Sequence, residues 1–267
     1  SFVLTLMLVG GVSIIGELII FTNISSVQKT WDKFELGRSE KVRALNALRR
    51  EFGYGGMIHL FKNYVLRQDQ TQVANVIAKM GGINTVISRY SALNLSNDEE
   101  AALDDIRKVV GAYFKNLIVA ETLNEQGKNP TEIDQLVKVD DFPAINALTI
   151  LEQNAERDFK TSEPILSRPH LLAKLRKSLG YNGMIHHFKN FILRQGQERV
   201  TATKNHLDVA KGVLALYAGH SLNAAESKAV MDILNVVNAY SKALSEAIRL
   251  TAEDKLPRAI DEAVIVD

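Results

Sequence analysis

The chain has 267 residues, and its 32 basic side chains nearly balance its 31 acidic ones. It therefore lacks the basic excess that is typical of a nucleic-acid-binding surface, and we expect no nucleic-acid partner. Cysteine is absent, which excludes disulfides, iron–sulfur clusters and thiolate zinc sites.

The first 24 residues are the most apolar stretch of the chain. No charged residue precedes Glu17, and the apolar character continues to Ile24. Since about 20 apolar residues suffice for a helix to cross a bilayer, residues 1–24 are predicted to form a transmembrane-like helix. A very apolar core helix is the alternative. A cleaved signal peptide fits less well, because a basic leader and a small-residue cleavage pattern are missing.

Helical spacing of apolar residues then continues through most of the chain. The predicted helices of the first half cover residues 25–51, 57–68, 70–93 and 97–126. The pair Gly81-Gly82 is expected to disturb the third helix, and Ser96 or Asn97 to cap the fourth. Residues 128–142 are expected to form a loop, and the next helix should start near Pro143 with Asp141 as its cap.

A long phrase occurs twice. FGYGGMIHLFKNYVLRQ ends at Gln68, and LGYNGMIHHFKNFILRQ ends at Gln195. Gly53 and Gly180 differ by 127, and the same offset pairs residues far beyond the phrase without a net insertion or deletion. Such self-similarity at a fixed period indicates a tandem duplication.

The duplication predicts the domain organisation. We expect an all-α fold with two tandem four-helix-bundle modules, residues 25–142 and 143–267. One long helix from near Pro143 to Lys177 should close the first module and open the second, with a break or kink at Pro164 and Pro169. The helix that closes the second module should begin after Asp267.

The helix in each copy of the phrase is amphipathic. At 100° per residue, its apolar side chains share one face, and its polar side chains recur at matching places on the other. The candidate ligand-binding residues are those of the polar face in both copies: His59, Lys62, Asn63, Arg67, His186, Lys189, Asn190 and Arg194.

Three interpretations of this polar face remain open. It could form a hydrogen-bonded network with acidic partners such as Asp134, Asp140 or Asp261, because buried polar groups need partners. It could bind a small anion or carboxylate, with an arginine as the fork and a lysine as the point charge. It could also be an ordinary solvated face.

Motifs of catalysis and metal binding are not evident. His186 and His187 are neighbours in a helix and point about 100° apart, which makes them a poor metal pair. The glycines follow no strand and so do not resemble a dinucleotide-binding turn. We predict that the chain is not an enzyme and that it has no cofactor and no metal site.

The duplicated phrase, the leading apolar stretch and the Val-Asp-Asp sequence ending at Asp141 resemble the all-helical periplasmic sensor regions of bacterial transmembrane signalling receptors, which include chemoreceptors, histidine kinases and nucleotide cyclases. The resemblance implies an extracytoplasmic ligand-sensing input domain, anchored in the inner membrane by its N-terminal helix and acting as a homodimer. It assigns no ligand residues. A helical protein-interaction or structural bundle without a small-molecule ligand is the alternative.

Overall fold

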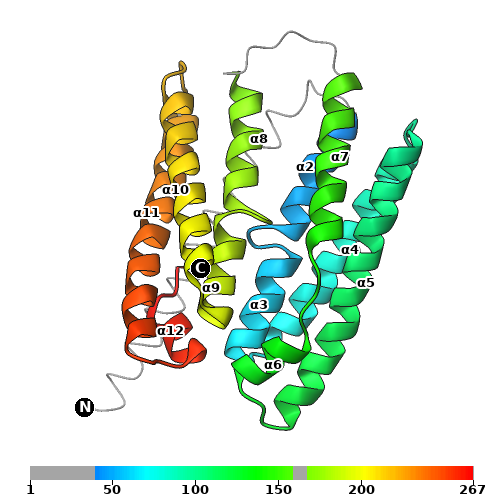
Figure 1. Ribbon diagram of the computed structural model, residues 1–267. Coiled ribbons are helices and arrows are strands. Elements are labelled where there is room, and N and C mark those ends of the chain that lie inside the picture. Colours follow the sequence, from blue (N-terminus) through cyan, green and yellow to red (C-terminus); the bar gives the residue numbers. More distant parts are fainter. Residues whose placement is uncertain (1–39, 159–166, 267) are drawn as a thin grey trace.

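The computed structural model describes residues 40–158 and 167–266, and within these ranges the fold is all-α, as predicted (Figure 1). No strand occurs in either range. The helices of the first half are α2 Glu40–Phe52, α3 Met57–Arg67, α4 Thr71–Ser91, α5 Asn97–Glu125, α6 Pro130–Leu136 and α7 Phe142–Asp158. Those of the second half are α8 Arg168–Leu179, α9 Met184–Arg194, α10 Gln197–Ala218, α11 Ala224–Ala252 and α12 Pro257–Ala263.

The helix starts follow from local capping chemistry. The Ser96 side chain accepts from the backbone N–H of Glu99, and the Glu99 carboxylate accepts from the N–H of Ser96. This reciprocal arrangement satisfies two amides that a helix start otherwise leaves unpaired. Asn223 and Glu226 repeat the arrangement at the start of α11. The prediction of a cap at Ser96 is therefore confirmed.

The duplication is visible in the secondary structure. The helices α2 to α6 recur in the same order as α8 to α12, and most of their ends keep the offset found in the sequence. For example, α3 ends at Arg67 and α9 ends at Arg194. By the same offset, the counterpart of α7 falls on residues 15–31, which lie outside the described residues.

The helices of each half pack against one another, and the buried apolar side chains of both halves form one continuous core. In the first half α7 lies against α5 and α2, while α3 lies against α4. In the second half α10 contacts α8, α9 and α11. Between the halves, α3 contacts α9, α2 contacts α8, α6 contacts α9, and α12 contacts α3 and α6. The two copies of the repeated phrase therefore lie side by side at the centre of the molecule (Figure 1).

Two local expectations are wrong, and a third is confirmed by position. The helix α4 runs through Gly81 and Gly82 without interruption, because its hydrogen bonds need no side chain at these positions. The predicted loop over residues 128–142 contains the short helix α6, which the Asn129–Pro130 start and the Glu132 capping box support. Asp141 occupies the predicted cap position of α7, because its carbonyl oxygen accepts from Ile145 N at 3.0 Å, while the side chain that binds Phe142 N is that of Asp140, at 3.0 Å.

The single long connecting helix is also not observed. The helices α7 and α8 are separate, α7 ends at Asp158, and α8 runs back in the opposite direction (Figure 1). Pro169 lies in the first turn of α8, where its missing N–H costs nothing. The predicted kink at Pro164 lies outside the described residues.

The predicted transmembrane-like helix over residues 1–24 also lies outside the described residues. Within residues 40–158 and 167–266, none of the helices is both long enough and apolar enough to cross a membrane.

Candidate functional site

Glycines bring α3 and α9 together at the start of the repeated phrase. A Cβ on Gly53 would lie 2.8 Å from the Arg49 carbonyl oxygen and 3.1 Å from the Gly180 Cα. Gly56 and its counterpart Gly183 are equally constrained, since an added Cβ would come within 2.4 Å and 2.6 Å of backbone oxygens of the preceding turn. Gly53 and Gly180 therefore permit the close approach of the two copies, and Gly56 and Gly183 permit the tight turn before each helix.

The polar face of each phrase helix is buried against the other half of the molecule. Lys62 is 3% exposed and Lys189 is 2% exposed, and the histidines and asparagines of both copies are also buried. The interpretation as an ordinary solvated face is therefore wrong. The sequence could not show this burial, because it depends on the meeting of two segments more than 100 residues apart in the chain.

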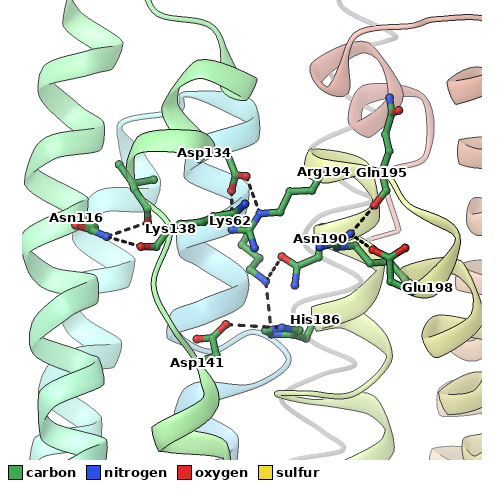
Figure 2. Close-up of polar contacts among 12 residues, drawn as sticks. Lys62, Asn116, Asp134, Lys138, Asp141, His186, Asn190, Arg194, Gln195 and Glu198 are labelled. Atoms are coloured by element: carbon green, nitrogen blue, oxygen red, sulfur yellow. Dashed lines mark hydrogen bonds and ion pairs between the residues drawn. The ribbon is translucent and has the colours of Figure 1, made fainter.

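Both arginines pair with a carboxylate from the opposite half. Arg67 Nε donates to Asp261 Oδ2 at 2.7 Å. Arg194 Nε and a second guanidinium nitrogen donate to the two oxygens of Asp134 at 2.7 and 2.9 Å (Figure 2). Asp134 and Asp261 occupy equivalent positions in α6 and α12, so the two pairs are reciprocal across the interface. The acidic partners are among those that the network interpretation named.

The two lysines are equivalent in sequence but differ in their partners. Lys189 Nζ donates to Asp261 Oδ1 at 2.8 Å. Lys62 Nζ instead donates to Asn190 Oδ1 at 2.6 Å and lies 3.5 Å from His186 Nδ1 (Figure 2). In the part of the chain that the structure describes, no carboxylate lies within ion-pair distance of Lys62. Burial lowers the pKa of Lys62 to about 7, and Asp141 opposes this shift only from a distance.

His59 and Asn63 form a separate contact on α3. The backbone N–H of Gly55 donates to His59 Nδ1 at 3.0 Å, and Asn63 Nδ2 lies 3.3 Å from His59 Nε2. These contacts hold the His59 ring against the glycine turn that precedes α3. Seven of the eight candidate residues contact the opposite half or line the space between α3 and α9, whereas Asn63 contacts His59 of its own helix.

Asp141 joins the interface to the start of α7. Its Oδ1 accepts from Tyr113 Oη of the first half at 2.7 Å and from Tyr181 Oη of the second half at 2.8 Å. Its Oδ2 lies 3.7 Å from His186 Nε2 (Figure 2). Burial lowers the pKa of His186 well below its ordinary value, with Lys62 adding to the shift, so this imidazole is neutral at pH 7. The carboxylate therefore receives neutral donors from both halves.

The sequence reasoning missed this role of Asp141 and the two tyrosines. A signal was present, because Tyr113 and Tyr240 match at the duplication offset, and Tyr54 and Tyr181 match within the phrase itself. The packing of the aromatic rings also repeats between the two copies. Phe61 packs edge to face against Tyr113, and Phe188 packs in the same way against Tyr240.

A small cavity lies between the two phrase helices. Its volume is about 10 Å³, and it is lined by the paired histidines and lysines of both copies together with Tyr181, Gly53 and apolar side chains. That volume is close to the minimum that holds one water molecule. Within the described residues, no group of three or more histidine or carboxylate side chains is arranged to hold a metal ion.

Comparison with known proteins gives no match. No protein family, no curated protein and no solved structure matches the chain. The site is therefore interpreted from its own geometry.

Proposed function

We propose that the chain is the extracytoplasmic ligand-sensing input domain of a bacterial transmembrane signalling receptor, anchored in the inner membrane and facing the periplasm. The sequence resemblance supports this class of protein. The observation that carries the sensing role is the contact of Asp141 with both halves at the start of α7. A ligand that changes the spacing of α3 and α9 also changes the support of α7.

The arginines do not favour direct ligand contact. Both guanidinium groups are already held by Asp134 and Asp261, so a ligand that used them would have to displace a carboxylate. The cavity between α3 and α9, at about 10 Å³, would have to widen for a ligand to reach the lysine and histidine side chains that line it. Signalling then consists of a small change at the interface that reaches the membrane through the long helices.

A screen with spin labels tests this function. The chain is labelled at Gln153→Cys on α7 and Lys242→Cys on α11, two exposed positions in a protein without native cysteine. Compounds that raise its melting temperature are then tested for a change in the distance between the labels. We expect at least one stabilising compound to shift this distance, and Asp141→Asn to abolish the shift. Stabilisation without any change in the distance would contradict the sensing mechanism.

A separate experiment tests the proposed extracytoplasmic location of the chain. The full-length protein is expressed in its host with a tag in the α4–α5 turn, and protease is added to spheroplasts and to lysed cells. We expect cleavage of the tag in intact spheroplasts. Protection there, with cleavage only after lysis, would contradict the extracytoplasmic assignment.

A helical protein-interaction bundle is the second candidate, and one surface favours it. On α5 the side chains of Phe114 and Ile118 are 46% and 51% exposed, and they lie one helical turn apart. The corresponding positions of the second half are Ser241 and Ser245. The apolar pair is thus particular to the first half. Loss of a co-purifying protein in a Phe114→Ser, Ile118→Ser variant would support this second function.

A further inference from the structure

The outer side of α5 carries a seam of side chains at coiled-coil spacing. Six residues at alternating steps of four and three lie along one side of this helix: Arg107, Gly111, Phe114, Ile118, Glu121 and Glu125. Among the described helices, α5 packs against α4, α6 and α7, and it forms the outer edge of the first half (Figure 1). The α5 seam is exposed or half-exposed along its whole length.

The centre of the α5 seam is apolar. It contains Phe114 and Ile118, the two side chains whose exposure was noted above. A Cβ on the neighbouring Gly111 would meet no atom within 4 Å apart from the backbone of its own helix, so another helix has room to approach there. The corresponding centre in α11 is Ser241 and Ser245. The fold therefore does not require apolar side chains at this place, and adjacent exposed ones are typical of an interaction surface.

The two ends of the α5 seam carry opposite charges. Arg107 lies towards the N-terminal end, and its side chain is 45% exposed. It donates to Asp104 of its own helix and to Ser91 Oγ at the end of α4, which hold it at the surface. Glu125 is exposed at the C-terminal end. The α5 seam is therefore basic at one end, apolar in the middle and acidic at the other end.

This order of side chains is complementary to itself. Phe114 and Ile118 are each two residues from Asn116, and the arginine and the last glutamate are each nine residues from it. Turning a second α5 by 180° about this level places each phenylalanine opposite an isoleucine and each arginine opposite a glutamate, all in one register. A parallel pair would instead place arginine opposite arginine, which like-charge repulsion disfavours.

We propose that the α5 seam binds a second copy of this chain, as an antiparallel pair of α5 helices related by a two-fold axis at the level of Asn116. In such an interface every contact occurs twice. The inference goes beyond the proposed function, which implies a homodimer without assigning its surface. Because one helix pair buries less than the roughly 1,600 Å² of a standard interface, we expect association in the micromolar range.

Cysteine pairing tests the register in a chain that has no native cysteine. The single variants Gly111→Cys and Glu121→Cys are purified, mixed and oxidised mildly. In the antiparallel pair these two positions face each other, whereas identical positions lie about 15 Å apart along the helices. We therefore expect a disulfide-linked dimer from the mixture and none from either variant alone. A mixture that does not link, or links no faster than the single variants, would overturn the proposal.

The second half provides a matched control for cysteine pairing. Asn238→Cys and Ile248→Cys occupy the positions of α11 that correspond to the two tested positions of α5. Their mixture should not link, because α11 has serines in place of the apolar centre. Linking of this mixture at the same rate would show random collision and overturn the assignment to α5.

Sedimentation equilibrium over roughly a hundredfold range of concentration tests the apolar centre. We expect the wild type to dimerise and Phe114→Ser to raise the dissociation constant at least about tenfold. Leu216→Ser on α10 removes a side chain that is 48% exposed, and it should keep the wild-type value. Circular dichroism checks that each variant remains helical. A wild type that stays monomeric, or equal effects of the two substitutions, would overturn the proposal.

A charge exchange tests the ends of the α5 seam. Arg107→Glu places acidic side chains opposite each other and should weaken the dimer. The double variant Arg107→Glu, Glu125→Arg restores opposite charges across the antiparallel pair and should recover the affinity. A double variant that is no tighter than Arg107→Glu would contradict the antiparallel register.

Failure of the dimer surface and failure of the proposed function give different results. A chain that links as expected and yet is protected from protease in spheroplasts keeps the dimer surface and loses the receptor assignment. A monomeric chain whose α7–α11 distance changes with a compound loses the dimer surface and keeps the sensing function. A monomeric chain that retains a different protein through Phe114 would assign the α5 seam to that partner and overturn the proposal.

Discussion

At the scale of single residues, Lys62 stands out as a buried lysine whose pKa is lowered. Burial lowers its pKa from 10.5 to about 7 in the folded state. Asp141 and Asp134 raise this pKa, and Arg194 and Arg199 lower it further. The unfolded chain therefore binds more protons than the folded chain between about pH 7 and pH 10.5, and stability should rise with pH across this window.

The first prediction concerns this linkage. We expect Lys62→Met to be more stable than the wild type at pH 6, by up to about 5 kcal/mol, because the pKa falls from 10.5 to about 7 and each pKa unit corresponds to about 1.4 kcal/mol. The advantage should shrink towards pH 10, where the folded wild-type lysine is neutral and the unfolded one approaches its own pKa of 10.5. Urea unfolding of both proteins at pH 6, 8 and 10 measures the difference in their free energies of unfolding. A constant difference would show that Lys62 does not titrate in the window.

The second prediction compares the two arginines. Arg194→Ala leaves the Asp134 carboxylate buried without its partner, whereas Arg67→Ala leaves Asp261 with Lys189. We expect Arg194→Ala to lower the free energy of unfolding by about 1–3 kcal/mol and Arg67→Ala to lower it by less. Chemical denaturation at pH 7 provides both values. Equal losses would mean that Lys189 does not stabilise Asp261.

At the scale of elements, the close packing of the phrase helices depends on glycine. A Cβ on Gly53 would meet the backbone of both Arg49 and Gly180, whereas a Cβ on Gly81 in the middle of α4 would have no atom within 4 Å apart from the backbone of its own helix. Neither residue has positive φ. The two positions therefore test packing and helix propensity separately.

The third prediction follows from this contrast. Gly53→Ala should destabilise the protein by about 1–3 kcal/mol, because the backbone must move to accept the methyl group. Gly81→Ala should stabilise it by about 0.5–1 kcal/mol, as alanine is the better helix former at an open site. Thermal unfolding of both variants measures these changes in stability. Destabilisation by Gly81→Ala would show that α4 is less regular than observed.

At the scale of the whole molecule, the two halves are tied by reciprocal ion pairs and by the Asp141 contacts. Separating the halves would place Asp134, Asp261 and Lys62 in new surroundings and break the bonds that cross the interface. We therefore interpret the two halves as one cooperative unit, even though the sequence describes two copies.

The fourth prediction is that the chain unfolds in a single transition. Circular dichroism and tyrosine fluorescence should give the same midpoint in urea. The double variant Asp134→Ala, Arg194→Ala should keep the fold but broaden or split the transition, because one of the two reciprocal pairs is gone. Two separate transitions in the wild type would contradict this interpretation.

The fifth prediction concerns assembly. The resemblance to transmembrane receptors implies a homodimer, so the full-length protein in membranes should crosslink as a dimer, with controls at increasing dilution in detergent. A monomeric full-length protein in membranes would contradict it. A monomeric soluble fragment would not, because the membrane segments contribute to such dimers.

The sequence by itself determined the helices and the duplication. Helical periodicity and capping residues are local signals, so the ends of α3 and α5 agree with the prediction to within a residue, and the offset between the copies reappears in the helix bounds. The short helix α6 was missed because its few residues carry too little periodicity to stand out from a loop. The regular course of α4 through Gly81-Gly82 was missed because propensity is a weak preference that packing overrides.

Only the tertiary structure decided how the eight candidate residues are used. The polar face of one copy meets the other copy, so its partners come from positions that no local pattern can connect. Identical sequence positions also acquired different chemistry, because Lys189 reaches Asp261 while Lys62 reaches Asn190 and His186. Burial and pairing depend on which segments meet in space, and that is why the charge balance around Lys62 could not be read from the chain alone.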